Sequence, residues 1–436
     1  MKKIISALVL GAMTIGFAAA DISVGLNYRN GVELFKYVNT GADGRATDDY
    51  GNTYIDSGYD KSGAAYNLFN LTGWNSGKDS LSLKASGDIF SLSTTIQPTI
   101  ASNSSVFHIM TVDAEFGNFY VKTGWNGDGV MNFRVKRFCD NGNEEGKVGE
   151  TFKLGSAFTG SEGLCANNQT SFGTGRNLFA YAGYTVVFND KANLKMQIGY
   201  ISDRNIDSLG TATWKNYPGW SLFLAPRIKK VLAAEVFVKG HMNSKEQQTI
   251  VTGAYFTPLV LNVLADSSVG GSVVIFDGKL MEYNFDLRTL WEVNDKLQIT
   301  TMHKFAKLCK KGSDADDPRY AGVDGAAVGA LAGLTGFKSS QVLWNIVNAR
   351  YVVNPTVTLI GTIGELTDLD DGFQGGRESK DGTQLYVYPH AQFYANPKIS
   401  VSAGVVAAFG GLGANEEANK DVDIIVNVPV MIRVKL

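Results

Sequence analysis

The feature that most constrains this chain is a period of two in its hydrophobic side chains. Near the middle of the sequence, the apolar residues Tyr283 and Phe285 alternate with the polar residues Asn284 and Asp286. Successive side chains of a β-strand point to opposite faces, so this pattern predicts strands with one apolar and one polar face. The same alternation recurs in residues 80–86, 90–97, 119–125, 194–200, 384–393 and 428–436.

Short polar segments with the composition of hairpin turns separate the alternating runs. They are Gly87-Asp88, Gly117-Asn118, Asn189-Asp190-Lys191, Lys229-Lys230, Asn294-Asp295-Lys296, Asn354-Pro355 and Asn396-Pro397. Longer polar segments lie between the hairpins, at 31–63, 127–175, 203–218, 307–338, 367–382 and 410–421. Short turns therefore alternate with long loops along much of the chain. This asymmetry is typical of membrane-spanning β-barrels, whereas a soluble sandwich has no reason to keep its short turns at one end.

The runs predict an all-β, transmembrane antiparallel β-barrel of about 18 strands, with roughly 16 to 20 as the range. Segment 64–86 is the ambiguous one, because Gly73 to Lys78 could form a turn. The last run, which ends at Leu436, is expected to pair with residues 22–28 and close the ring. The expected strands lie near 21–38, 64–86, 89–99, 106–116, 119–126, 177–188, 193–202, 219–228, 231–242, 250–264, 271–277, 279–292, 296–306, 339–352, 356–366, 383–394, 398–409 and 422–436.

Aromatic residues gather beside the short turns, as in the girdles that mark membrane interfaces. They are Phe116, Phe119, Phe188, Trp291, Phe393 and Tyr394, with Trp125 and Trp220 near the opposite strand ends.

The first twenty residues have the pattern of a cleaved export signal. Lys2 and Lys3 precede the apolar run 4–17, and the small residues that end at Ala20 fit a cleavage site. The rest of the chain, 21–436, is expected to form a single barrel domain. Its longest apolar stretch, 254–265, is shorter than the ~20 residues that a spanning helix needs.

Net charge and cysteine content exclude two classes of protein. The formal charge of −2 offers no basic excess for binding nucleic acid, and three cysteines in 436 residues do not form a disulfide scaffold.

Together, the alternation, the turn pattern and the final strand resemble the outer-membrane, porin-like β-barrels of double-membraned bacteria. The overall character is similar to porin-like surface proteins of spirochaetes. The resemblance covers 21–436 in pattern, although this chain ends on Leu436 where the class usually ends on an aromatic residue. It implies an outer-membrane location, contact with outer-membrane lipid and insertion by barrel-assembly machinery.

The function that the resemblance implies is passive diffusion of small hydrophilic solutes or ions through the barrel. Two alternatives stay open: a surface adhesin or antigen whose barrel anchors loops that bind host ligands, and a soluble exported β protein. The sequence also leaves open whether the barrels associate as homo-oligomers.

Charged residues on the polar strand faces are the candidates for lining the pore. Both signs occur with a small cationic surplus, which predicts weak ion selectivity. The alternative is that these charges pair across neighbouring strands and hold the wall together. The candidates are Lys84, Glu115, Lys122, Lys195, Arg227, Glu235, Lys239, Glu282, Asp286, Arg288, Glu292, Lys304 and Arg433.

Two long loops could narrow the pore. Loop 127–175 contains Cys139 and Cys165, which could form a disulfide in an oxidising compartment. Loop 307–338 contains an Ala- and Gly-rich run, which is either a short helix folded into the lumen or part of an external loop.

No catalytic, metal or cofactor site is expected. The four histidines, His108, His241, His303 and His390, match no zinc-binding spacing, and the chain has neither a nucleophile elbow nor a phosphate-binding glycine loop.

Overall fold

The computed structural model describes residues 21–39, 64–70, 80–99, 104–125, 177–205, 219–242, 248–260, 267–308, 341–369, 383–409 and 424–436. Twenty β-strands account for the regular structure of these residues. The first ten are β1 (Asp21–Asn39), β2 (Ala64–Asn70), β3 (Ser80–Ser86), β4 (Phe90–Thr99), β5 (Ser104–Phe116), β6 (Phe119–Trp125), β7 (Asn177–Val187), β8 (Ala192–Asn205), β9 (Gly219–Ile228) and β10 (Leu232–Met242). The other ten are β11 (Gln248–Pro258), β12 (Ser268–Phe276), β13 (Lys279–Glu292), β14 (Leu297–Leu308), β15 (Gln341–Asn354), β16 (Val357–Asp368), β17 (Thr383–Asn396), β18 (Ile399–Gly404), β19 (Val406–Phe409) and β20 (Ile424–Lys435). Within the described ranges, no helix is long and apolar enough to cross a membrane.

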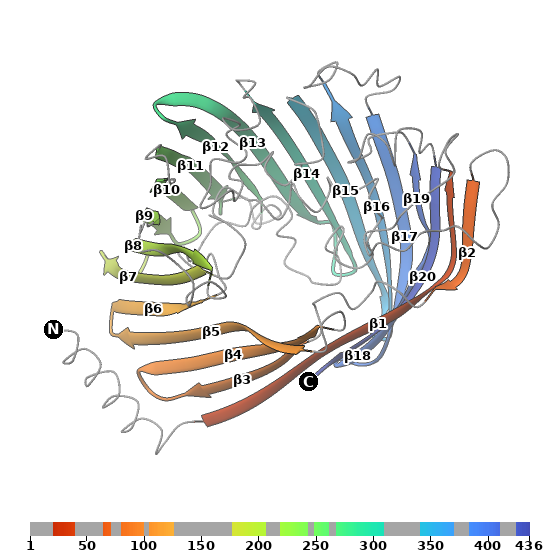
Figure 1. The fold of residues 1–436 in the computed structure, drawn as a ribbon, viewed down its shortest axis with the longest axis horizontal. Coiled ribbons are helices and arrows are strands. Elements are labelled where there is room, and N and C mark those ends of the chain that lie inside the picture. The colour runs from red at the N-terminus through yellow and green to blue at the C-terminus, as the bar shows by residue number, and fades with distance from the viewer. Residues whose placement is uncertain are drawn as a thin grey trace.

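The strands form one antiparallel sheet that closes on itself (Figure 1). Each strand from β3 to β17 pairs with its successor, and the pairing returns through β18, β19 and β20 to β1. One edge of β1 pairs with β20, and the other edge pairs first with β3 and then with β2. At the seam, the Leu436 N–H donates to the Leu26 carbonyl at 2.8 Å, and the Leu26 N–H donates back at 3.1 Å. The predicted pairing of the last run with the first strand is confirmed, but the paired residues are 27–38 and not 22–28, because residues 21–27 pair with β3.

Two positions of the ring are each filled by two short strands. β2 and β3 lie in line against β1, and β18 and β19 lie in line between β17 and β20, with a break at Val405. Twenty strands therefore fill eighteen positions, as predicted. The single strand expected over 64–86 is in fact two strands. The strand expected over 250–264 ends earlier, at Pro258, which has no N–H to donate to the ladder.

All seven predicted tight turns join successive strands of the ring. In four of them an asparagine side chain closes the turn by accepting the backbone N–H two residues later, at 2.8 to 2.9 Å. These asparagines are Asn189, Asn294, Asn354 and Asn396. Because successive strands are antiparallel, the seven turns lie at one end of the ring, here called the turn end.

The connections at the opposite end are not all long. Asp277 and Gly278 join β12 to β13 in two residues, and both have positive φ, as a two-residue hairpin turn requires. The segment 31–63, expected as a loop, begins inside β1, which continues to Asn39. The other predicted loops lie largely or wholly outside the described residues.

The two faces of the sheet differ in polarity and exposure. On β9, Ser221 and Phe223 are buried, whereas Leu222 and Leu224 are 50% and 46% exposed. The buried face, here called the inner face, lines the inside of the ring and carries the buried polar and charged side chains. The exposed face, here called the outer face, is largely apolar; its exposed members include Ile198, Leu222, Val236, Phe285, Leu359 and Ile363. A soluble domain has the opposite arrangement, with its apolar face covered.

Most of the predicted aromatic girdle lies on the outside near the turn end. Phe116, Phe119, Trp291 and Phe393 are between 41% and 53% exposed there. Tyr394 is a correction, because its alternation with Phe393 turns it to the inner face, where its hydroxyl donates to Gln392 Oε1 at 2.9 Å. Near the opposite strand ends, Trp220 is exposed on the outer face, in agreement with the prediction, and the Trp125 side chain is outside the described part.

Several aromatic rings lie directly across a glycine on the neighbouring strand. Gly183 faces Tyr120 and Gly270 faces Tyr255, and a Cβ on either glycine would overlap the facing residue. Glycine in a strand interior often marks such a close approach. The same arrangement places Trp220 across Gly240 and Phe237 across Gly253.

Replacement of Gly270 by alanine tests this packing. The new methyl group would overlap the Ala254 carbonyl oxygen and the Tyr255 backbone, so we expect Gly270→Ala to lower the free energy of unfolding by ~1–3 kcal/mol. Gly361→Ala is the matched control, because open space surrounds that position and a change within ~0.5 kcal/mol is expected. Urea unfolding followed by tryptophan fluorescence measures both, and equal stabilities of the two variants would contradict the packing account.

Candidate functional site on the inner face of the ring

The register places all thirteen predicted pore-lining residues on the inner face. For Glu282 this is a statement about the backbone alone, since its side chain is outside the described part. The others divide by exposure. Lys84, Glu115, Arg227 and Glu292 are exposed, and Lys122 and Lys195 are partly buried. Glu235, Lys239, Asp286, Arg288, Lys304 and Arg433 are buried.

The buried charges centre on one row that crosses β10 to β14. In register order the row consists of Glu235, Tyr255, Gly270, Asp286 and Lys304. Lys304 Nζ donates to Asp286 Oδ1 at 2.8 Å, and both side chains are almost fully buried. The Tyr255 hydroxyl crosses Gly270 and donates to Asp286 Oδ2 at 3.0 Å. Both carboxylate oxygens are therefore satisfied, as a buried charge requires.

A second row repeats this construction on β6 to β8. Tyr120 crosses Gly183, and its hydroxyl donates to Gln197 Oε1 at 3.0 Å. The Lys195 ammonium lies 4.5 Å from the centre of the Tyr120 ring, within the range of a cation–π contact. Tyr181 packs edge-on against the same ring, with centroids 5.9 Å apart. In both rows a tyrosine links alternate strands over an intervening glycine.

The inner face of β4 to β6 carries a more open charge pair. Lys122 Nζ lies 3.2 Å from Asp113 Oδ1, and the two side chains are 28% and 31% exposed. Ser91 Oγ donates to the other oxygen of Asp113 at 3.3 Å. Lys84 on β3 and Glu115 on β5, which flank this pair, are exposed. Charges on the inner face of β3 to β6 are therefore exposed or partly exposed, whereas those described on β10 to β14 are buried, apart from Glu292 at the turn end.

The cross-strand alternative is supported for three of the thirteen candidates, since Asp286 pairs with Lys304 and Lys122 pairs with Asp113. Sequence reasoning missed Asp113, although it alternates with Glu115 on the same strand face. It also missed Tyr120 and Tyr255, because the glycine that each tyrosine crosses lies far away in the sequence and is identified only by the register.

The histidines, cysteines and long loops singled out in the sequence do not belong to these inner-face rows. His303 is on the outer face, where its Nδ1 lies 2.8 Å from Asn345 Oδ1. Among the described residues, no group of three His, Cys, Asp or Glu side chains could hold a metal ion. Cys139, Cys165, loop 127–175 and all of loop 307–338 except its first two residues, which belong to β14, fall outside the described ranges, so their roles stay predictions.

The burial of the Asp286–Lys304 pair predicts a large effect when one partner is removed. Lys304→Met leaves a buried carboxylate without its cation, so we expect the free energy of unfolding to fall by ~3–5 kcal/mol. The double variant Asp286→Leu, Lys304→Met should recover part of this loss. Lys122→Met breaks the more exposed pair and should cost ~1 kcal/mol or less. Denaturant titration of the four proteins checks these values, and similar losses for Lys304→Met and Lys122→Met would contradict the burial of the first pair.

Comparison with known proteins gives structural neighbours only. No protein-family model matches the chain, and no curated protein does. Pseudomonas aeruginosa OccK3 (OpdO) is 11% identical with a TM-score of 0.48, over 95% of this chain and 96% of that chain. The anion-selective porin of Comamonas acidovorans is 12% identical with a TM-score of 0.42, over 96% and 100%. The outer-membrane channel DcaP of Acinetobacter baumannii is 11% identical with a TM-score of 0.40, over 96% and 98%.

Proposed function

We propose that the chain is an outer-membrane, porin-like channel through which small hydrophilic solutes or ions diffuse passively. The observation that carries this proposal is the inverted polarity of a closed β-ring. Large apolar side chains such as Leu222, Phe285 and Ile363 are exposed on the outer face, and ionic side chains are on the inner face. An apolar outside matches hydrocarbon, and a closed ladder leaves no unpaired strand edge in it.

The ring is wide enough for a conducting lumen. Barrels of about 16 to 18 strands leave an aqueous channel when nothing fills them. The charges of the inner face of β10 to β14 are buried apart from Glu292 at the turn end, which favours a path for solutes along the more open inner face of β3 to β6. There Lys84, Asp113, Glu115 and Lys122 supply both signs of charge, which favours weak rather than strong ion selectivity.

The orientation follows from the two ends of the ring. Outer-membrane barrels keep their short turns in the periplasm and their longer connections outside. The seven tight turns and both ends of the barrel domain lie at the turn end, which we assign to the periplasm. A periplasmic turn end agrees with export by the signal expected over 1–20, followed by insertion into the outer membrane by barrel-assembly machinery.

The alternative function is a surface adhesin or antigen with the barrel as its anchor. It depends on segments that the sequence predicts to be external loops, such as 127–175 and 307–338, and these lie wholly or almost wholly outside the described residues. A soluble exported protein, the third reading, would leave the outer face in water.

Single-channel recording from the refolded, purified barrel in a planar bilayer tests the proposal. Stepwise conductance increments support the channel. A barrel that inserts, as judged by heat-modifiable gel migration, yet never conducts would reject the channel and favour the anchor function. A protein that neither inserts nor migrates differently after heating would favour the soluble alternative.

The exposed inner-face lysine Lys84 should influence which ions pass. Lys84→Glu changes the local charge by two, so we expect the reversal potential in a salt gradient to shift towards cation preference, because lumen charge sets ion preference. Lys296→Glu makes the same charge change at an exposed tight turn outside the lumen and serves as the matched control. An unchanged reversal potential for Lys84→Glu, or an equal shift for both variants, would contradict a lumen position for Lys84.

A further inference from the structure

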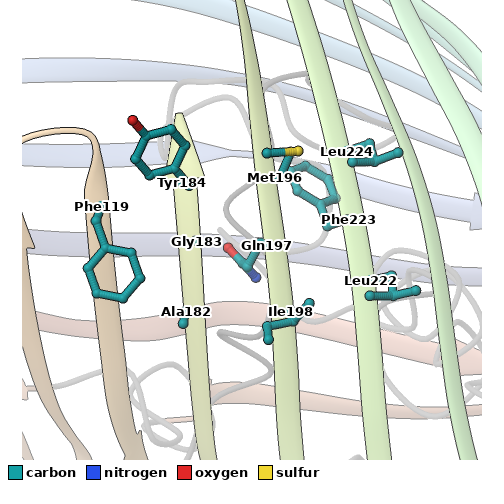
Figure 2. A pocket seen from close by; sticks show the side chains of 10 residues that line it. All are labelled: Phe119, Ala182, Gly183, Tyr184, Met196, Gln197, Ile198, Leu222, Phe223 and Leu224. Atoms are coloured by element: carbon teal, nitrogen blue, oxygen red, sulfur yellow. The ribbon is translucent and has the colours of Figure 1, made fainter. Parts of the chain in front are cut away.

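The outer face is hollowed between β6 and β9 (Figure 2). The hollow measures about 410 Å³, and its outward side chains are apolar apart from the Tyr184 hydroxyl. It forms where the small Ala182 is surrounded by larger neighbours. These neighbours are Phe119, Tyr184, Met196, Ile198, Leu222 and Leu224.

Two cross-strand rows of the outer face build this hollow. One row places Ala182 beside Ile198 and then Leu222, and the next row towards the turn end places Tyr184 beside Met196 and then Leu224. The Tyr184 hydroxyl points away from the hollow in Figure 2. The hollow is therefore apolar and continuous with the exposed outer face, and it has a polar group at its rim.

Three lysines lie at the turn end of the same strands. Lys191 ends the β7–β8 turn, and Lys229 and Lys230 form the β9–β10 turn. The two turns touch, since the Lys229 N–H donates to the Lys191 carbonyl at 2.7 Å. Asp190 is the acidic residue beside them, so the turns keep an excess of positive charge.

The spacing between the lysines and the hollow matches one lipid molecule. Met196 lies five residues from Lys191, and Leu224 lies five residues from Lys229. At ~3.3 Å per residue, this is roughly 17 Å along each strand. An acyl chain that extends from a headgroup beside the turns therefore reaches the hollow.

We infer that the outer face at β6 to β9 binds one anionic phospholipid, with an acyl chain in the hollow and the phosphate beside Lys191, Lys229 and Lys230. The inference rests on the part of the proposed function that puts the outer face in lipid, and not on conduction. Because lipid tails are as apolar as the hollow, the hydrophobic effect does not favour one lipid over another there. Selection comes from packing in the hollow and from attraction between the lysines and an anionic headgroup.

Native mass spectrometry of the detergent-solubilised barrel, titrated with phosphatidylglycerol or with zwitterionic phosphatidylethanolamine, tests this site. We expect one phosphatidylglycerol adduct that forms at lower lipid concentration than the phosphatidylethanolamine adduct. The variant Lys191→Ala, Lys229→Ala, Lys230→Asn should weaken phosphatidylglycerol binding about tenfold or more and remove the preference. Asparagine is chosen at 230 because Lys230 has a φ of 61°, which asparagine tolerates.

Ala182→Leu fills the hollow and should weaken the binding of both lipids. The matched controls are Ala349→Leu, another outer-face alanine, and Lys296→Ala with Lys398→Ala, lysines of other tight turns; these should bind as the unaltered barrel does. Heat-modifiable migration checks that each variant folds.

Equal binding of the two lipids, or a phosphatidylglycerol adduct that survives either the lysine variant or Ala182→Leu, would overturn the site. A dimer that Ala182→Leu abolishes would assign the hollow to a second copy and overturn it as well.

The lipid site and the channel can fail separately. A barrel that conducts but shows no preferred phosphatidylglycerol adduct rejects the lipid site alone. A barrel that binds the lipid with the expected variant pattern but does not conduct rejects the channel alone.

Discussion

The structure depends on closure of the backbone hydrogen-bond ladder between its first and last strands. A sheet with an exposed apolar face cannot leave a row of unpaired N–H and C=O groups at its edge, because neither lipid nor a covering layer would satisfy them. β1 solves this by pairing with β20 on one edge and with β3 and β2 on the other. The last residue, Leu436, takes part in the seam through its hydrogen bonds to Leu26.

Closure separates the side chains of every strand into two environments. The outer face is largely apolar, whereas the inner face must satisfy the charges that it buries. The inner face does this with tyrosines that cross a glycine to reach a polar partner two strands away, as Tyr255 reaches Asp286. This construction gives β10 to β14 a largely buried inner face with an ion pair at its centre, whereas the charges of β3 to β6 are more exposed. The inner face thus combines buried, paired charges with charges that are exposed to solvent.

Much of the ring could be predicted from the sequence, because strand periodicity and asparagine-rich turns are local signals. The turn at Asn294 and the alternation through Phe285 and Asp286 each depend on residues a few positions apart. The Asp286–Lys304 pair, the hollow around Ala182 and the position of Tyr394 were not predicted. The first two depend on the register of neighbouring strands, and register is not encoded in one strand alone. Nearness to a turn predicts Tyr394 in the girdle, but its alternation with Phe393 decides its face.

The most direct test of the central claim is an accessibility scan along β3 in lipid vesicles. Spin labels would be attached at single cysteines placed in turn at positions 81 to 86, after Cys139, Cys165 and Cys309 are changed to serine. The inverted ring predicts that oxygen, which concentrates in lipid, reaches labels at Leu81, Leu83 and Ala85, while a water-soluble nickel complex reaches those at Ser82, Lys84 and Ser86. Equal nickel accessibility on both faces, or the opposite alternation, would contradict an apolar exterior in lipid around a polar interior.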